Sequence, residues 1–305
     1  MQKVAEPERV DSANTAADCA VCGAALRGKP AVQLGRACMR TCGVCGSWTY
    51  LPRVSAAEQA AIHDNDDYFE HPYFMVRREA SPAQRRRCRD VFECLAPALD
   101  AAALRGEPIL DIGCDTGVFL QGAQEEFGIL PIGVDVCRRS VDAARQHGVQ
   151  AYRATIETAP AELTGLQLIT AIDVIEHVSD PGAFLREIRR RLRPGGLVYL
   201  ETPNIRSVVY RFGRALAALT GGRPAGLIER LFPPQHIQYF TRESLQSLAA
   251  GVGLEVVRLR ARVLPVAHIS ASLAALSAIT LLQACDRLLG TQILLCAALR
   301  RPLES

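Results

Sequence analysis

The sequence predicts an α/β protein in which a mostly parallel sheet carries helices on both faces. Short apolar runs typical of buried strands alternate with helical patterns along the chain. The predicted strands are residues 109–112, 131–135, 149–153, 166–172, 197–200, 254–259 and 293–299. Parallel neighbours need crossover connections, which helical stretches such as 138–147 and the helix starting at Asp180-Pro181 provide.

A glycine turn follows the first predicted strand. Asp111 lies near the carboxyl end of that strand, and Gly113 and Gly117 precede a helical pattern that opens at Val118. Such a turn lets a ligand approach the backbone, and the amides of the helix N-terminus point at it. A dinucleotide site would read Gly-x-Gly-x-x-Gly, whereas an acid at this place suits a ligand with a cationic amino group.

The stretch Asp111-Ile-Gly-Cys-Asp-Thr-Gly117 resembles motif I of class I S-adenosylmethionine (SAM)-dependent methyltransferases. The family usually reads Asp-x-Gly-Cys-Gly-x-Gly, and Asp115 replaces the middle glycine here. Asp tolerates positive φ, so we expect the turn to form. The resemblance implies a seven-stranded Rossmann-like methyltransferase sheet whose last strand is antiparallel. An ordinary βα turn of another α/β enzyme is the alternative.

The resemblance also implies a set of cofactor-binding residues. Asp135 ends the second strand, about 20 residues after the glycine turn, where an acid suits the ribose hydroxyls. Family position places Thr155 and Ile156 near the adenine, and Asp173 at the exit of the fourth strand. The complete predicted SAM site is Asp111, Gly113, Cys114, Gly117, Asp135, Thr155, Ile156 and Asp173. Residues 193–204 and 236–257 are similar to the same family.

Two Cys-x-x-Cys pairs near the N-terminus predict a structural zinc site. Cys19, Cys22, Cys42 and Cys45 have the spacing of a four-thiolate site, which leaves no open position for catalysis. Cys38 is a competing ligand, and unrelated buried or redox cysteines are the alternative. This stretch resembles the zinc-ribbon-like module that precedes the catalytic domain in some sugar and natural-product methyltransferases.

Glu176, His177 and His236 are the predicted catalytic residues. A hydroxyl acceptor must lose a proton, which calls for a general base or for a metal that lowers its pKa. Similar Glu-His pairs with a distant histidine occur in ubiquinone-pathway O-methyltransferases and small-RNA 2′-O-methyltransferases. There they bind a divalent ion, so the resemblance implies a site for magnesium, manganese or zinc at these three residues, beside Asp173. Alternatively, His177 is a base and His236 a packing residue, without metal.

The chain divides into five predicted segments. They are a disordered tail (1–18), the zinc module (19–54), a helical connector (55–105), a SAM-binding core (106–262) with a lid insertion (205–240), and an apolar helix with the last strand (263–305). The uncharged stretch 263–285 predicts a buried or amphipathic helix, with weak membrane-surface contact as the alternative. The arginine runs 85–89 and 186–193 predict exposed helix faces, and the aromatic segment 64–74 either covers the pocket or packs between domains.

The composition of the chain narrows the range of functions that it could have. The net charge of +3 argues against nucleic acid, and 11 scattered cysteines with no secretory signal favour reduced thiols in the cytoplasm. We therefore expect an O-methyltransferase acting on a small molecule: a sugar, a glycolipid precursor, or a phenolic or quinone-type natural product. Alternatives are a C- or N-methyltransferase of a nucleotide-linked sugar, an RNA-binding or RNA-modifying protein, and an inactive SAM-binding scaffold. The acceptor and the oligomeric state stay open.

Overall fold

A computed structural model describes residues 17–34, 37–65, 69–70, 82–220, 228–229, 231–263 and 273–303. Most of the predicted tail lies outside these residues, as do Tyr68, Tyr73 and Phe74 of the aromatic segment. Asp18 pairs with Ala25 in an isolated bridge, so the N-terminal module includes at least one residue that was assigned to the tail.

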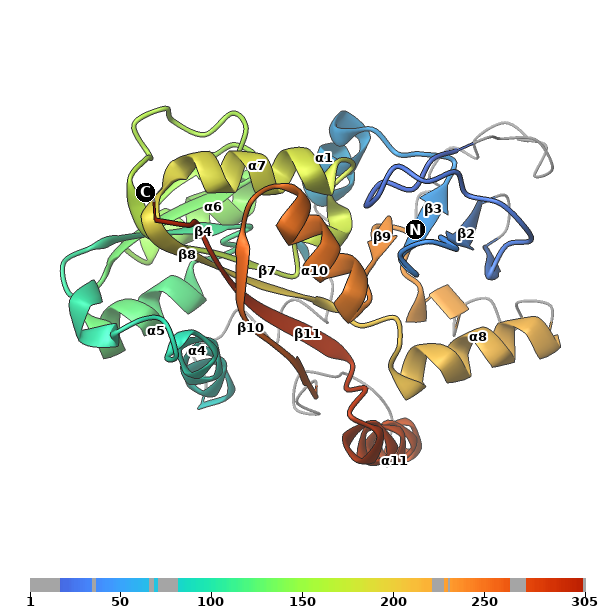
Figure 1. Cartoon of the computed structure of the whole chain (residues 1–305). Helices are drawn as coiled ribbons and strands as arrows, with labels where there is room; N and C mark the ends of the chain where they lie inside the picture. Colours follow the sequence, from blue (N-terminus) through green and yellow to red (C-terminus); the bar gives the residue numbers. More distant parts are fainter. Residues whose placement is uncertain are drawn as a thin grey trace.

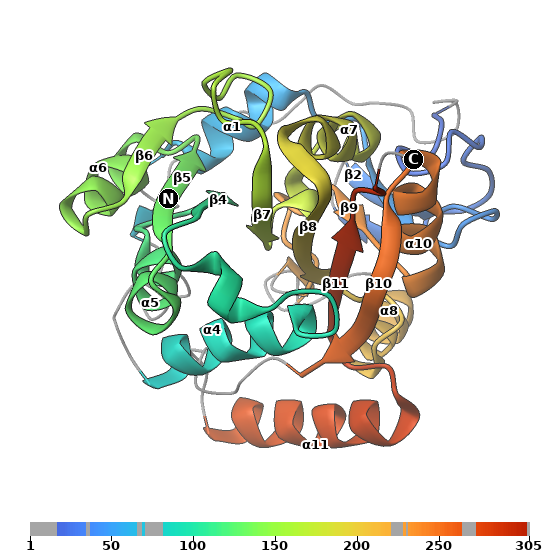
Figure 2. The same ribbon diagram turned by 60° about the vertical axis from the view of Figure 1, so that its left-hand side comes forward.

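The main sheet has seven strands in the order β10-β11-β8-β7-β4-β5-β6 (Figures 1 and 2). The strands are β4 Pro108–Ile112, β5 Leu130–Asp135, β6 Gln150–Arg153, β7 Leu166–Ile172, β8 Leu192–Pro203, β10 Glu255–Arg262 and β11 Leu294–Arg300. β4 to β8 pair in parallel, and β11 runs antiparallel to both of its neighbours. This confirms the predicted sheet and its antiparallel last strand.

Helices cover both faces of this sheet (Figure 2). They are α4 Pro82–Leu95, α5 Val118–Phe127, α6 Arg138–Gln146, α7 Pro181–Arg191 and α10 Arg242–Gly251. Leucines of α4 and α5 pack against one face, and those of α7 and α10 pack against the other, which gives two apolar layers. The Asp180 carboxylate accepts the Ala183 amide at 2.8 Å, so α7 begins at the predicted cap.

β8 begins earlier than the sequence predicts. The sequence predicts a strand that starts at Leu197, but Leu192 already pairs with Leu166. The register then shifts, because Leu168 pairs with Leu197, and Gly195 takes a φ of 78° within this irregular stretch. The glycines therefore form a bulge inside a longer strand rather than a separate turn.

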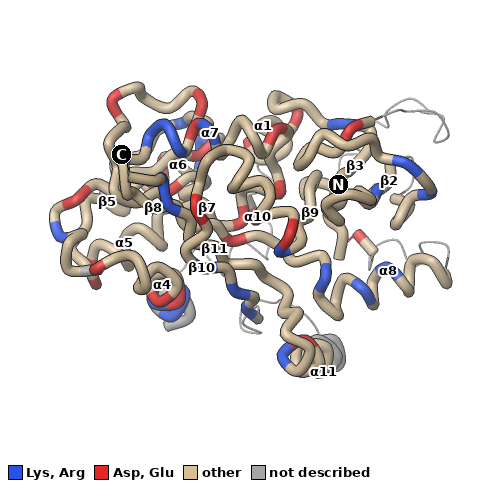
Figure 3. Tube along the Cα trace, in the orientation of Figure 1, with Lys and Arg blue, Asp and Glu red and all other residues tan. Residues whose placement is uncertain are grey.

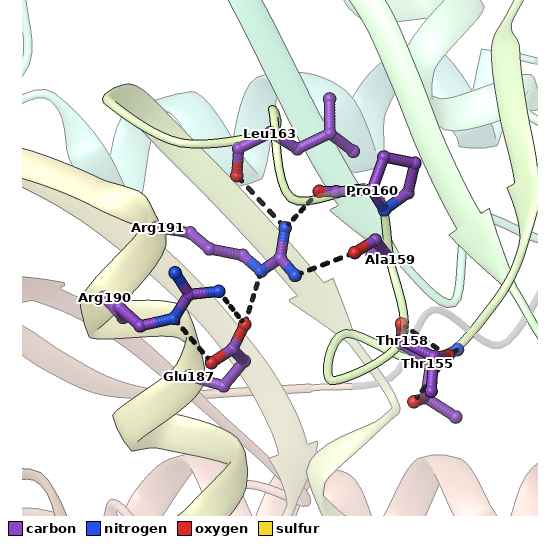
Figure 4. A network of polar contacts seen from close by, with 8 residues as sticks. All are labelled: Thr155, Thr158, Ala159, Pro160, Leu163, Glu187, Arg190 and Arg191. Atoms are coloured by element: carbon purple, nitrogen blue, oxygen red, sulfur yellow. Dashed lines mark hydrogen bonds and ion pairs between the residues drawn. The ribbon is translucent and has the colours of Figure 1, made fainter.

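The arginine run 186–193 was predicted to form an exposed helix face, but one of its members is buried. Arg191 is only 1% exposed, and it donates hydrogen bonds to the carbonyls of Ala159, Pro160 and Leu163 (Figure 4). Its Nε also binds the Glu187 carboxylate at 2.7 Å. The charge pattern could not predict the burial of Arg191, because the carbonyls that it binds come from a loop about 30 residues earlier in the chain.

A smaller sheet joins the N-terminal module to the insertion 205–240. Its strands are β1 Val32–Leu34, β2 Ala37–Thr41, β3 Trp48–Leu51 and β9 Gln238–Tyr239, in that order. Trp48 of the module stacks on Phe232 of the insertion, with ring centroids 5.9 Å apart. α8 (Val208–Thr220) of the insertion also contacts β1. Two segments far apart in sequence thus form one unit beside the main sheet.

Two more helices complete the described fold. α1 (Ala56–His63) connects the small sheet to the core, and α11 (Leu273–Leu289) precedes the last strand. α11 begins well inside the predicted range 263–285, of which residues 264–272 lie outside the description, and continues beyond it. Among the helices that the structure describes, none combines the length and apolar character needed to cross a bilayer.

Candidate active site and zinc centre

The glycine turn after β4 has the backbone conformation that its sequence predicts. Gly113 and Gly117 have φ values of 70° and 78°, and Asp115 has 46°. A Cβ on Gly113 would lie 2.6 Å from Val174, so the close approach itself requires glycine. The Asp115 carboxylate accepts a hydrogen bond from the Ser140 hydroxyl at 3.1 Å. Aspartate therefore replaces the usual middle glycine without disrupting the turn.

Two acids flank this turn. Asp111 is 3% exposed and accepts a hydrogen bond from the Thr170 hydroxyl at 2.6 Å. Burial raises the pKa of Asp111 to about 7, although that hydrogen bond opposes the shift. Asp135, at the end of β5, accepts the amides of Asp115 and Cys137 at 2.9 and 2.8 Å. Both carboxylates face one cavity.

This cavity has a volume of about 540 Å³ and lies at the carboxyl ends of β4, β5 and β7. Seven predicted cofactor residues line it: Asp111, Gly113, Cys114, Asp135, Thr155, Ile156 and Asp173. Gly117 is outside the lining, since its role is to begin α5 in a left-handed conformation. The cavity has the place and size of a ligand site in an open α/β sheet.

One wall of the cavity comes from residues that sequence reasoning missed. Ala56, Gln59, Ala60 and His63 of α1 contribute to it. Gln59 donates to the Gln235 carbonyl at 3.3 Å, and the Ser179 hydroxyl donates to the Val54 carbonyl at 2.9 Å. α1 is therefore fixed against the core. The contact between α1 and the cavity joins residues that are far apart in the sequence, so the local pattern of residues 56–63 could not predict it.

Glu176, His177 and His236 come together at the exit of β7. Glu176 and His177 lie on a short 3₁₀ helix, η2 (Ile175–His177), and the ligand atoms of the three residues all lie within 4.8 Å of one another. His177 Nδ1 lies 2.8 Å from the Gln235 carbonyl, to which it donates. The structure thus unites all three predicted residues. His177 lines the cavity itself, whereas the other two lie outside the described lining.

Two buried polar atoms of this cluster lack a protein hydrogen-bond partner among the described residues. They are Oε1 of Glu176 and Nδ1 of His236. The other Glu176 oxygen accepts the Thr202 hydroxyl at 2.9 Å. Unsatisfied buried acceptors are costly, so such atoms favour an additional bound group. His63 contributes a third imidazole, whose ring centroid lies 4.7 Å from that of His177.

Burial shifts the pKa values of all three residues of this cluster. Burial, reinforced by Asp173, holds the pKa of Glu176 well above its usual value. Burial and the neighbouring His236 ring hold the pKa of His177 well below its usual value. Burial also lowers the pKa of His236 to about 4. Both imidazoles are therefore neutral at physiological pH, the form that can accept a proton or bind a metal.

Arg87 is a site residue that the sequence analysis placed on an exposed face. It is buried, and it donates to Asp173 Oδ2 at 2.8 Å and Glu201 Oε1 at 2.9 Å. Arg86 and Arg89 of the same run are exposed, as predicted. The useful signal was a pair of acids, Asp173 directly after β7 and Glu201 on the neighbouring strand β8, since buried carboxylates need a cation.

The four predicted zinc ligands converge in the N-terminal module. The Sγ atoms of Cys19 and Cys45 are 3.7 Å apart, and those of Cys22 and Cys42 are 3.5 Å apart. Tetrahedral Zn–S bonds of about 2.3 Å would place sulfurs about 3.8 Å apart, so the arrangement fits one ion. The competing ligand Cys38 lies in β2 and outside the four-sulfur cluster.

Comparisons with known proteins agree with this architecture. A family model described as a methyltransferase domain matches residues 82–259, more than half of the chain. The ubiquinone biosynthesis O-methyltransferase of Bordetella avium is 33% identical over 111 residues, or 34% of this chain and 46% of that protein. The enzyme of the same name from Caulobacter vibrioides is 32% identical over 160 residues, or 49% and 60%. The chain spans about half the length of the curated relatives it matches.

Solved structures share the fold. Haemonchus contortus phosphoethanolamine N-methyltransferase 2, in complex with SAM, matches with a TM-score of 0.58 and 16% identity over 84% of this chain and 63% of that one. A SAM-dependent methyltransferase from Thermotoga maritima matches with a TM-score of 0.52 and 17% identity over 80% and 99%. Taken with the family match and the sheet order, these findings show that the chain belongs to the methyltransferase-domain family, as a class I SAM-dependent methyltransferase.

Proposed function

We propose that this chain transfers the methyl group of SAM to a hydroxyl of a small molecule, with help from a divalent ion. The observation that carries the proposal is the convergence of Glu176, His177 and His236 within 4.8 Å beside the cavity. Methyl transfer to a hydroxyl requires a proton to leave the acceptor, and this cluster offers the means to remove it. The relatives named as ubiquinone biosynthesis O-methyltransferases support an oxygen acceptor.

The residues around the glycine turn would orient the cofactor. Asp111 suits the cationic amino group, Asp135 the ribose hydroxyls, and Thr155 and Ile156 the adenine. When bound, SAM supplies a methyl group that its sulfonium already activates. The chain then has to align the acceptor oxygen with that methyl group and exclude water. α1 supports this role, because four of its residues form part of the cavity wall.

Glu176, His177 and His236 fit a divalent ion. Oε1 of Glu176 and Nδ1 of His236 have no protein hydrogen-bond partner among the described residues, and the imidazoles are neutral. A bound ion would lower the pKa of the acceptor hydroxyl. Two imidazoles with one carboxylate suit zinc or manganese better than magnesium. Asp173 is less available as a ligand because Arg87 already binds it at 2.8 Å.

The N-terminal module has a structural role in this proposal. Four thiolates around zinc would leave no open position, so the module would fix α1 and β9 rather than take part in catalysis. β9 of the insertion 205–240 pairs with β3 of the module, and none of the described residues of the insertion lines the cavity. The role of this insertion as a lid over the cavity therefore remains a proposal. The lining of the cavity supports α1 better as its cover. The eleven cysteines, none of which forms a disulfide, suit a cytoplasmic location.

The experiment combines metal analysis with labelled methyl transfer. The whole chain, purified without chelators, is incubated with methyl-labelled SAM and panels of sugars, glycolipid precursors and phenols. Glu176→Gln and His236→Ala should each lose one bound metal per chain and most turnover, while their affinity for SAM stays unchanged. Glu162→Gln, an exposed acid outside the cavity, is the control. Thermal melts check that the buried Glu176 variant still folds.

Two results would contradict the proposal separately. Unchanged turnover and metal content in both variants would reject the divalent ion but leave the oxygen acceptor intact. Methylated products in which the label sits only on nitrogen or carbon would reject the hydroxyl acceptor.

A further inference from the structure

Over residues 280–289, where the structure describes the side chains, α11 packs with polar residues inward and leucines outward. Gln283 and Asp286 are 5% and 0% exposed, whereas Leu281, Leu288 and Leu289 are 67%, 88% and 61% exposed. Leu281 and Leu288 are seven residues apart, so they share one face of the helix. A helix on the surface of a globular protein normally buries its leucines and exposes its acids. This inversion indicates that something outside the described chain covers the leucine face.

Specific contacts fix the orientation of α11. One Asp286 oxygen accepts the Val208 amide at 2.6 Å, at the start of α8, and the Thr291 hydroxyl at 2.8 Å. Asp286 thus caps the N-terminus of a neighbouring helix. Rotating α11 to bury its leucines would break this cap. The leucines are therefore exposed because the Asp286 contacts hold α11 in this orientation.

α8, which lies beside α11, also exposes large apolar side chains. The two helices contact each other and lie at the edge of the molecule (Figures 1 and 2). Phe212 and Leu219 of α8 are 50% and 86% exposed and also lie seven residues apart. Ten large apolar side chains are exposed in the described part of the chain, and five of them belong to these two helices. We name these five, with the arginines given below, the α8–α11 face.

The charge of this face is positive. Arg211 and Arg214 of α8 and Arg287 of α11 are exposed. Figure 3 marks basic positions in blue along both helices. The only acid in the sequence of either helix is the buried Asp286. Arginines beside leucines and phenylalanine characterise helices that lie in the plane of an anionic bilayer surface. A second copy of the chain would instead bring like charges together, which disfavours a dimer through this face.

We propose that the α8–α11 face binds the surface of a bilayer that contains anionic lipids. The leucines and Phe212 enter the boundary between headgroups and acyl chains, while the arginines contact lipid phosphates. This inference is independent of the acceptor, because none of these residues lines the cavity.

Vesicle flotation tests the proposal with the full chain. Vesicles of phosphatidylcholine alone are compared with vesicles that also contain phosphatidylglycerol. We expect binding to the anionic vesicles that weakens as salt is raised. The double variant Leu281→Ser/Leu288→Ser should lower the bound fraction at least tenfold, and Arg211→Gln/Arg214→Gln should bind no better to anionic than to neutral vesicles. Leu130→Ser, at a 52% exposed leucine on β5, is the matched control and should bind like the parent chain.

SAM affinity and thermal melts establish that each variant is folded, and gel filtration gives its oligomeric state. Equal binding to both kinds of vesicle, or unchanged binding of the leucine double variant, would overturn the proposal. A dimer that becomes monomeric in the leucine variant would also overturn it, because a second copy would then be the occupant.

Discussion

Asp135 accepts the Asp115 amide with one carboxylate oxygen, at 2.9 Å, and the Cys137 amide with the other, at 2.8 Å. The acid expected to bind the ribose therefore also fixes the glycine turn and the entry to α6. The proposed ribose contact and the observed turn geometry therefore depend on the same side chain. Disrupting it should weaken every part of the cofactor contact at once.

The first prediction concerns Asp135→Ala. We expect the affinity for SAM to fall about 10- to 100-fold, because hydrogen bonds to a charged acceptor contribute about 1.5–3 kcal/mol each. S-adenosylhomocysteine carries the same ribose and should weaken by the same factor. Calorimetric titration measures both ligands. Asp142→Ala, at an exposed acid on α6, should bind like the parent chain, and retained affinity in Asp135→Ala would refute the assignment.

The second prediction is the pH dependence of cofactor affinity. Burial raises the pKa of Asp111 to about 7, so the carboxylate gains a proton as the pH falls through that value. A protonated Asp111 no longer attracts the cationic amino group of SAM. We expect binding to be up to about eightfold weaker at pH 6 than at pH 7.5, which is the ratio of the ionised fractions of Asp111 at these two pH values. Asp111→Asn should remove this decline; an equally steep decline in that variant would assign it to another group.

The third prediction separates the zinc ligands from the nearby Cys38. Cys42→Ser should release one zinc per chain and lower the melting temperature by roughly 5–10 °C, since metal binding supplies folding energy to so small a module. Cys38→Ser should keep the zinc, because Cys38 lies outside the four-sulfur cluster. Elemental analysis with thermal melts measures both effects. Zinc loss in Cys38→Ser with retention in Cys42→Ser would reverse the assignment.

The fourth prediction compares two neighbouring arginines of α7. Arg191→Met should lower the free energy of unfolding by about 2–4 kcal/mol, because three loop carbonyls lose their donor. Arg190→Met should change it by less than about 0.5 kcal/mol, since its pair with Glu187 is solvent-exposed. Urea unfolding measures both. Equal effects would mean that burial of Arg191 contributes nothing specific.

Local signals were enough to predict the main sheet and the glycine turn. The strands β4 to β7 follow from hydrophobic runs, and the start of α7 follows from the cap residue Asp180, whose effect is short-range. The four cysteines were predicted for the same reason, because two close pairs need only one long-range contact.

Features set by distant partners were missed. Arg87 and Arg191 read as exposed because a run of arginines usually is, and their acids and carbonyls lie elsewhere in the sequence. His63 gave no signal, since a single histidine on a short helix has many roles. The early start of β8 was hidden because Pro194 and two glycines imitate a turn.

The pairing of β3 with β9 has a consequence for biosynthesis. Thr49 and Gln238, whose side chains bond across this pair, are separated by 189 positions. While the nascent polypeptide leaves the ribosome, the β3 edge remains without its neighbour until most of translation is complete. Unpaired edges recruit other strands, so the newborn chain is vulnerable to aggregation during that interval. A chain terminated before residue 238 would keep that vulnerability permanently and should accumulate in inclusion bodies.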